Sequence, residues 1–409
     1  MRNILLIMAG LFVGVLLAEV LVTAGNVSPF FRVLPAVEPQ LGGPDHDIGY
    51  AYKPDRDVLW NVENKVQVHI NTQAIRRDGD VSDKADDGFR IALMGDSFTE
   101  ALQVEWPVTF AALAERTLQQ DVGDKVDIVN LAMGGSNGLR MLTRFEKEVP
   151  EFKPDMGLML LPDFKLYNGE LRHDSQGPAY GINEQGQVER SYGFRNRFSQ
   201  RYADSVPGRA FIYMMHHSHL FRSAYYQAKE AKSFLSEMRE PSPIPNFVFP
   251  ASKEESQLSV SAQCEQEALR NSWEFWVVSM TSDNRKIVDQ FLKDMRAAGD
   301  AVGKDTPMLL ALRVPVPADS CRDELIARQK IITAAKDVIN RHGIAFVDWD
   351  EMLVRVMQSE AAGNAGLMEL QGFGRHAGSG HLNYRGHRVW AGVLADVLRP
   401  YVQAGVKSP

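Results

Sequence analysis

Short apolar runs alternate with helix-like stretches through the middle of the chain. Apolar runs at residues 90–94, 126–133 and 155–161 each end in turn residues, and amphipathic stretches at 111–120 and 138–149 lie between them. Buried strands of a parallel sheet read as continuous apolar runs, and helices connect such strands. The pattern therefore predicts an α/β domain whose parallel sheet is covered by helices on both faces.

The same pattern returns near the C-terminus. Residues 307–314 and 344–349 are apolar runs, and the stretch 323–343 between them has the composition of a helix. A last helix-like segment occupies the end of residues 380–398. We expect the two runs to extend the sheet that the earlier runs begin.

Three residues follow directly after predicted strands. They are Ser97, Gly135 and Asp163. In open α/β sheets the ligand site lies outside the carboxyl ends of the strands. The sequence therefore predicts a site at this edge of the sheet.

The rest of the chain divides around this domain, which we place at residues 90–405. Residues 25–89 are a connector in which 66–76 alternates like an edge strand and 76–88 is a charged, turn-rich loop. A long, aromatic-rich insertion spans about 164–285. It follows the third predicted strand, so we interpret it as a lid or substrate platform; peripheral decoration is the alternative.

The N-terminus, residues 1–24, carries an apolar run at residues 4–24. That length suits a bilayer-spanning helix, and Arg2 before it favours a cytoplasmic N-terminus. We expect a single-pass inner-membrane anchor with the main domain in the periplasm. The alternative is a cleaved signal, with Val22-Thr23-Ala24 as its site and a secreted or periplasmic product. Glu19 is unusual in such a segment, and a position near the interface would reduce its cost.

Composition narrows the possible functions. The chain has 409 residues, 44% hydrophobic and 24% charged, with a formal net charge of −7. This is a globular composition, and a net charge of −7 gives no indication of nucleic-acid binding, which needs a concentrated basic face. Cys264 and Cys321 lie in the exported part, where they could form a disulfide or remain buried thiols.

Ser97 is the first candidate for chemistry. Ser97 and Glu100 have the spacing of a helix capping box, so a cap is one interpretation. A serine between a strand end and a helix is also well placed for nucleophilic attack, because the helix N-terminus stabilises negative charge. The base would be His381, in the loop before the last helix, whereas His387 is expected to pack or cap. His216 and His219 lack a third ligand at suitable spacing, so we expect no metal site.

Three stretches, in this order, resemble the conserved blocks of the SGNH (GDSL-type) hydrolases. They are GDSFTEALQV from residue 95, NLAMGGSNG from residue 130 and HLNYRGHRVWA from residue 381. The connector is similar to bacterial membrane-anchored members in DIGYAYKPD and VHINTQAIRRD. The resemblance implies a three-layer α/β/α, flavodoxin-like fold with a large helical and loop insertion and an N-terminal transmembrane helix.

The resemblance also implies a serine esterase mechanism without a cofactor. Ser97 would attack an acyl carbonyl, and His381 would move the proton. The backbone N–H groups of Ser97 and Gly135 would form the oxyanion hole, while Asp96 would be structural. We expect hydrolysis or transfer of O-acyl groups, acetyl above all, on cell-envelope polysaccharide or a small ester. The alternative is a catalytically impaired protein that binds or assembles polysaccharide.

Two positions depart from the family pattern. Pro162 stands where an asparagine side chain normally donates to the oxyanion; Asn168 or Asn137 could replace it. The acidic residue normally found two or three positions before the histidine is absent, since Gly378 and Ser379 stand there. The remaining candidates for orienting His381 are a backbone carbonyl, Ser379, Asp348 and Asp350.

Overall fold

The structure is a computed structural model of the chain. It describes residues 2–27, 41–60, 63–123, 125–161, 177–196, 201–202, 205–218, 220–221, 224–225, 282–303, 305–312, 332–333, 335–348, 367–374 and 380–405.

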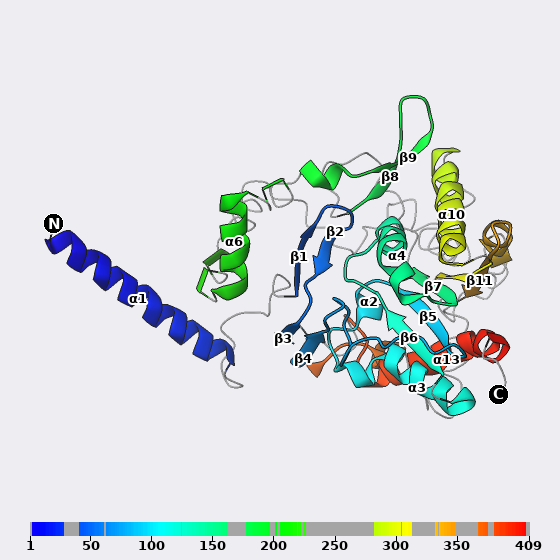
Figure 1. Cartoon of the computed structure of the whole chain (residues 1–409), viewed down its shortest axis with the longest axis horizontal. Helices are drawn as coiled ribbons and strands as arrows, with labels where there is room; N and C mark the ends of the chain where they lie inside the picture. Colours follow the sequence, from blue (N-terminus) through cyan, green and yellow to red (C-terminus); the bar gives the residue numbers. More distant parts are fainter. Residues whose placement is uncertain are drawn as a thin grey trace, which may run out of the picture.

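The central element is a parallel sheet (Figure 1). Its strands are β5 (Phe89–Met94), β6 (Val126–Asn130), β7 (Met156–Leu161), β10 (Met308–Leu312) and β11 (Ile344–Asp348). They lie in the order β11-β10-β7-β5-β6, and every neighbouring pair is parallel. Renumbered along the chain this order is 2-1-3-4-5, the flavodoxin-like arrangement. The prediction of a parallel sheet built from these five apolar runs is confirmed.

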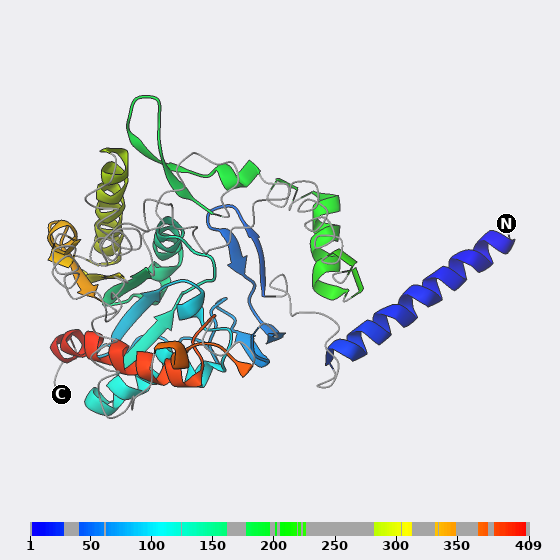
Figure 2. The same ribbon diagram turned by 180° about the vertical axis from the view of Figure 1, so that it is seen from behind.

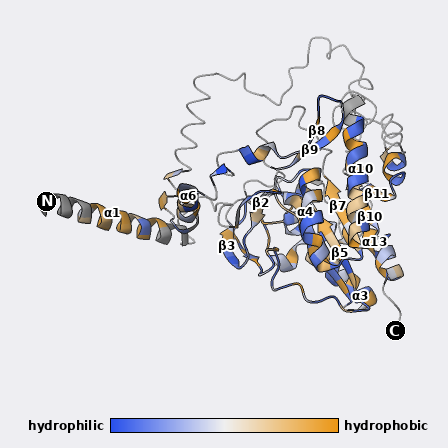
Figure 3. Ribbon diagram, turned by 45° about the horizontal axis from the view of Figure 1, so that its top comes forward, coloured by the Kyte–Doolittle hydropathy of each residue, from blue (hydrophilic) through white to orange (hydrophobic). Residues whose placement is uncertain are grey.

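Helices cover both faces of the sheet, as Figures 1 and 2 show. One face packs against α3 (Phe110–Val122) and α13 (Tyr384–Gly405), the other against α4 (Gly138–Phe152) and α10 (Ser282–Val302). Successive side chains of a strand point to opposite faces. Ile91 thus packs on the α3 side, and Ala92 packs on the α4 side. Both faces are apolar, which is why the central strands are coloured as hydrophobic in Figure 3.

The segment before the sheet forms two antiparallel hairpins. One pairs β1 (Gly42–Asp45) with β2 (Gly49–Tyr52), and the other pairs β3 (Arg56–Trp60) with β4 (Val66–Ile70). The alternating residues Val66, Val68 and Ile70 are buried, as the period-two pattern predicted. They pack in a small core with Leu102 and Met133, from the loops that follow β5 and β6. The hairpins therefore lie against the carboxyl edge of the sheet.

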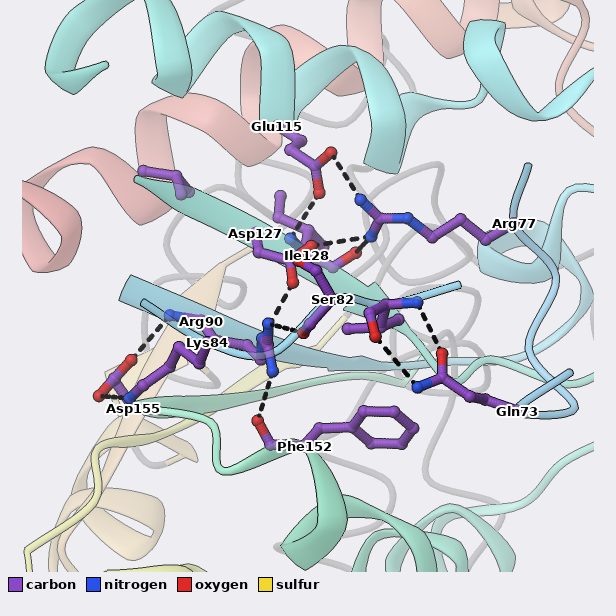
Figure 4. A network of polar contacts seen from close by, with 12 residues as sticks. Gln73, Arg77, Ser82, Lys84, Arg90, Glu115, Asp127, Ile128, Phe152 and Asp155 are labelled. Atoms are coloured by element: carbon purple, nitrogen blue, oxygen red, sulfur yellow. Dashed lines mark hydrogen bonds and ion pairs between the residues drawn. The ribbon is translucent and has the colours of Figure 1, made fainter. Parts of the chain in front are cut away.

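Polar contacts fix the charged loop that joins the hairpins to β5 (Figure 4). The guanidinium of Arg77 donates to Asp127 at 2.8 Å. Arg90, 4% exposed, donates to Asp127 at 2.9 Å and to the carbonyl oxygens of Ser82 and Phe152 at 2.7 and 2.9 Å. The sequence marked this stretch as turn-rich and polar, and the structure shows that Arg77 and Lys84 of the loop pair with Asp127 of β6 and with Asp155, just before β7.

The insertion contributes several described elements. They are β8 (Ala179–Ile182), β9 (Val188–Ser191), η3 (Gly193–Asn196) and α6 (Val206–His217). Tyr180 of β8 donates to Asp294 of α10 at 2.7 Å, so the β8–β9 hairpin is attached to one helical layer. Cys264 and Cys321, which the sequence allows either as a disulfide or as free thiols, lie outside the described residues.

The N-terminal helix α1 (Arg2–Val27) extends away from the α/β domain in Figures 1 and 2. Most of its described side chains are apolar and exposed, for example Phe12 at 66% and Leu21 at 72%. A search of the described residues finds no helix with both the length and the hydropathy needed to span a bilayer. Glu19 accepts hydrogen bonds from Ser218 Oγ at 2.6 Å and from the N–H of Leu220 at 3.1 Å.

Candidate active site

The turn after β5 holds Ser97 at the edge of the sheet. The short helix α2 (Ser97–Glu100) begins at Ser97, and its N-cap is Asp96, whose side chain accepts from the N–H of Phe98 at 3.0 Å. The capping-box interpretation of Ser97 is therefore wrong by one residue. The extended backbone of Asp96 makes it the cap, which leaves the serine hydroxyl available for other contacts.

Gly95 allows this turn to be tight. A Cβ at Gly95 would lie 2.1 Å from Oγ1 of Thr99. Ser97 follows the carboxyl end of β5, next to both β6 and β7, where the strand order reverses. Ligand sites of doubly wound sheets lie at this switch point.

His381 reaches the same point from the other end of the chain. It lies in the loop before α13, and its carbonyl oxygen accepts from the N–H of Gly372 at 2.8 Å. Its Nε2 lies 2.8 Å from Oγ of Ser97. The ring of Phe98 packs beside the imidazole, with ring centroids 5.0 Å apart. The structure thus brings the two predicted residues into hydrogen-bond contact across 284 positions of sequence.

The carboxylate that orients His381 belongs to Glu63. Its Oε1 lies 2.7 Å from Nδ1 of His381, and its Oε2 accepts from the backbone N–H of the same residue at 3.0 Å. An ionised carboxylate only accepts hydrogen bonds, so Nδ1 carries the proton and Nε2 faces the serine as an acceptor. The arrangement Ser97–His381–Glu63 has the connectivity of a serine-hydrolase triad.

Glu63 lies at the tip of the β3–β4 hairpin in an unusual backbone conformation. Its φ is 65°, in the left-handed region that non-glycine residues rarely adopt. Opposite it, Gly380 has a φ of 85°, and a Cβ there would lie 2.7 Å from Oε2 of Glu63. Strained residues of this kind cluster at functional sites. The backbone conformations of Glu63 and Gly380 together leave the space that the carboxylate occupies.

Sequence reasoning missed Glu63 because it sought the acid near His381 or on the sheet. Asp348 ends β11, while Ser379 and Asp350 lie outside the described residues. The alternating runs at 56–60 and 66–70 indicate a hairpin, and its tip carries one carboxylate, Glu63. Nothing local relates that tip to a histidine 318 positions away.

The loop after β6 holds Gly135, the second residue predicted to donate to the oxyanion. Gly135 has a φ of 68°, and a Cβ on its neighbour Gly134 would lie 3.5 Å from Cβ of Ser97. The loop backbone therefore lies against the nucleophile. The N–H of Ser97, at the first position of α2, is one that the helix itself leaves unpaired. Both N–H groups predicted for the oxyanion hole belong to segments that meet at Ser97.

The side-chain donor of the third sequence block is not supplied by Asn137. That residue caps α4, since Oδ1 accepts from the N–H of Arg140 at 2.8 Å and Nδ2 donates to the carbonyl of Pro178 at 3.2 Å. Pro162, Asp163 and Asn168 lie outside the described residues.

Two residues of the N-terminal hairpin region hold the nucleophile turn from behind. Arg76, 3% exposed, donates to the carbonyl oxygens of Glu100 (2.8 Å) and Val104. Burial lowers the pKa of Arg76 to about 10, which leaves it charged at neutral pH. Tyr52 donates to the buried carboxylate of Glu100. Removing the hairpins and the loop that follows them, residues 41–88, would therefore disturb the nucleophile turn as well as the triad.

His387, the second histidine of the C-terminal block, has a packing role as expected. It is 1% exposed, stacks on Phe110 and accepts from the N–H of Phe110 through Nδ1 at 3.2 Å. Burial, with smaller contributions from Arg76 and His381, lowers its pKa to about 3. It therefore remains neutral and helps to begin α3 beside α13.

No cluster of three or more histidine, cysteine, aspartate or glutamate residues suited to a metal ion occurs in the described part of the chain. Position 219 of the His216–His219 pair lies outside that part. Among the described residues, the groups that meet at Ser97 are its hydroxyl, the imidazole of His381 and, behind it, the carboxylate of Glu63.

The sequence matches no protein-family model, and no curated protein matches it either. Several solved structures are similar. A lipase/acylhydrolase from Enterococcus faecalis is 13% identical, with 78% of this chain and 100% of that chain covered and a TM-score of 0.33. A catalytic mutant of Axe2, an acetylxylan esterase from Geobacillus stearothermophilus, is 12% identical, with 80% and 100% covered and a TM-score of 0.33.

A lipolytic protein of the G-D-S-L family from Desulfitobacterium hafniense is 11% identical. The match covers 76% of this chain and 100% of that chain, with a TM-score of 0.32. TM-scores this low support no conclusion about activity.

Proposed function

We propose that this chain is a serine esterase-type enzyme of the SGNH kind that hydrolyses or transfers O-acyl groups. The observation that carries the proposal is the hydrogen-bonded series Ser97 Oγ, His381 and Glu63, with contacts of 2.8 and 2.7 Å. A serine with only a structural role in the turn would not need an imidazole at its hydroxyl or a carboxylate behind that imidazole. The chemistry is acyl transfer through a covalent intermediate.

In the first half of the reaction Ser97 Oγ attacks the acyl carbonyl carbon while its proton passes to Nε2 of His381. The negative charge on the former carbonyl oxygen is stabilised by the N–H groups of Ser97 and Gly135. Glu63 stabilises the resulting imidazolium through Nδ1–H. The C–O bond to the alcohol then breaks, and Nε2 returns the proton to the departing oxygen, leaving an acyl-serine.

In the second half water or a sugar hydroxyl attacks the acyl-serine. His381 takes the proton of the attacking group and returns it to Oγ as the acyl bond to Ser97 breaks. Water gives a hydrolase, and a sugar hydroxyl gives a transferase. We propose acetylated cell-envelope polysaccharide as the substrate, since an exported site of this chemistry would meet glycan esters.

The same proposal places the chain in the inner membrane or periplasm. Residues 4–24 would direct export and remain as an anchor or be cleaved, and Arg2 and the exposed apolar side chains of α1 support membrane targeting. Alkaline-phosphatase fusions after residue 40 should be active. Mass spectrometry of the purified N-terminus distinguishes retention from cleavage, and an inactive fusion would contradict export.

The catalytic proposal is tested by a serine-reactive fluorophosphonate together with acetyl release from a chromogenic ester. Labelling of the full chain should disappear in Ser97→Ala and fall by several orders of magnitude in His381→Ala. The partly buried serine Ser191 of β9, changed to alanine, is the matched control and should leave labelling unchanged. Acyl appearing on an added oligosaccharide faster than free acid would identify a transferase.

The enzyme proposal would be contradicted if the wild-type chain is not labelled and releases no acetyl, yet binds glycan as well as Ser97→Ala does. That result would favour the polysaccharide-binding or assembly function instead.

A further inference from the structure

The β3–β4 hairpin, which carries the acid Glu63, needs contacts with other segments to keep its tip in one position. Glu63 is at the tip of a two-stranded hairpin, and isolated hairpins of this size are only marginally stable. Its φ of 65° adds a local cost. A carboxylate must be placed within a fraction of an ångström to orient an imidazole, so other contacts have to hold the tip.

Asn64, the next residue, makes the first such contact. Its Nδ2 donates to the carbonyl oxygen of Gln103 at 2.8 Å. Gln103 is 3% exposed and follows α2 by three positions, in the segment that leaves the nucleophile turn. The hairpin tip is therefore attached to the segment that carries Ser97.

Tyr384 makes the second contact. The same Nδ2 of Asn64 lies 3.4 Å from the hydroxyl of Tyr384, and that hydroxyl donates to Oε2 of Glu105 at 2.8 Å. Tyr384 is the first residue of α13, three positions after His381, and its ring packs edge-on against Phe373. Partial burial and the hydrogen bond to Glu105 raise the pKa of Tyr384, so its hydroxyl stays protonated.

These contacts join three segments at one point. The hairpin tip carries the acid, residues 103–105 continue from the nucleophile turn, and the start of α13 follows the base. Asn64 and Tyr384 contact neither Ser97 nor the imidazole in this set of hydrogen bonds. We infer that Asn64 and Tyr384 are positioning residues, which act on the proposed reaction by holding Glu63 against His381.

This inference rests on the proposed function for its kinetic test, which is a double-mutant cycle on the full chain. Asn64→Ala and Tyr384→Phe should each lower kcat about tenfold and leave KM unchanged, because the acid is displaced while substrate contacts are kept. In a Glu63→Gln background the same changes should cause no further loss, since they act through the absent carboxylate.

A matched control lies at the other end of the same hairpin. Asp57 of β3 faces His69 of β4, with Oδ1 and Nδ1 2.9 Å apart. Asp57→Asn changes a histidine–carboxylate contact of the same kind but far from the tip, and it should leave kcat unchanged. Losses that add to that of Glu63→Gln, or an equal loss in Asp57→Asn, would overturn the inference.

A second readout does not depend on activity. The proton on Nδ1 of His381, shared with the carboxylate, should give a downfield resonance in 15N-histidine-labelled protein, assigned by its absence in His381→Ala. The signal should vanish in Glu63→Gln, broaden in Asn64→Ala and Tyr384→Phe, and persist in Asp57→Asn. A signal that stays sharp and unchanged in both Asn64→Ala and Tyr384→Phe would overturn the inference. The expected pattern in a chain without esterase activity would refute the proposed function alone.

Discussion

At the scale of single residues, the site depends on a few atoms whose positions are closely fixed. Ser97 Oγ, Nε2 and Nδ1 of His381 and Oε1 of Glu63 form one line of contacts. Glu63 and Gly380 both adopt left-handed backbone conformations on either side of the carboxylate. Changes of a single group here should alter activity much more than stability.

Glu63→Gln tests the role of the carboxylate. The amide can present its NH₂ to Nδ1 and favour the wrong tautomer of His381, so kcat should fall by about 10⁴-fold. Ester hydrolysis by purified full chain measures this. Glu369→Gln, which changes an exposed carboxylate paired with Arg385, is the control and should retain wild-type kcat. A loss of less than about tenfold in Glu63→Gln would remove Glu63 from the mechanism.

Gly380→Ala tests the space that the carboxylate occupies. The new Cβ would lie 2.7 Å from Oε2 of Glu63. The alanine backbone would also have to adopt a φ of 85°. We expect kcat to fall by about 10²-fold, because a displacement on the order of 1 Å misplaces the acid. Gly374→Ala is matched, since Gly374 has a φ of 53° with nothing within 4 Å of its Cβ position. Its stability should fall while kcat is kept; equal kinetics for both variants would contradict the steric argument.

At the scale of elements, strands and helices present these residues at one edge. The turn from β5 to α2 places the nucleophile, the loop before α13 places the base, and the β3–β4 hairpin places the acid. The alternation of apolar runs and amphipathic stretches predicted the sheet strands and the helices α3, α4 and α13. It did not predict that an N-terminal hairpin would reach the loop before the last helix, because that contact depends on packing across the whole sequence.

The contact between α3 and α13 makes stability sensitive to acid through His387. Its pKa is about 3 in the folded chain, below the ordinary 6.5, so the unfolded chain binds one more proton between these values. The free energy of unfolding should therefore fall as the pH is lowered from about 6.5 towards 3, by about 1.4 kcal/mol per pH unit from this group.

Chemical denaturation at a series of pH values checks this. In His387→Asn the amide oxygen can still accept from the N–H of Phe110. The slope of the unfolding free energy against pH between about 3 and 6.5 should decrease by the contribution of one proton. Thr117→Ala on α3, which changes no titratable group, is the control and should keep the slope. An unchanged slope in His387→Asn would show that His387 does not titrate in this way.

At the scale of the whole molecule, the N-terminal hairpins and the α/β domain are joined by buried charges as well as apolar contacts. Arg90 of β5 links Asp127 of β6, the loop before β5 and the end of α4 (Figure 4). The polar network thus includes residues on both sides of the boundary at residue 90 that the sequence predicted between connector and domain. The β3–β4 hairpin contributes Glu63 to the site, and the loop that follows it contributes Arg76 to the support of the nucleophile turn.

Arg90→Met should destabilise the chain by about 3–5 kcal/mol, since it leaves Asp127 and two carbonyl oxygens without this donor at a buried position. The midpoint of urea unfolding measures the loss. Lys293→Met removes an exposed ion pair on α10 with Asp289 and should change stability by less than about 1 kcal/mol. Similar effects of the two changes would contradict a special role for the buried network.

The sequence by itself determined the sheet strands, the helices α3, α4 and α13, the serine on its strand-to-helix turn and the histidine before the last helix. These depend on local periodicity and turn chemistry, which neighbouring residues encode. Only the tertiary structure decided that Glu63 is the acid and that Asp96, not Ser97, caps α2. A carboxylate at a hairpin tip looks like any surface turn in the sequence, and its partner is set by how two distant segments pack against the same edge of the sheet.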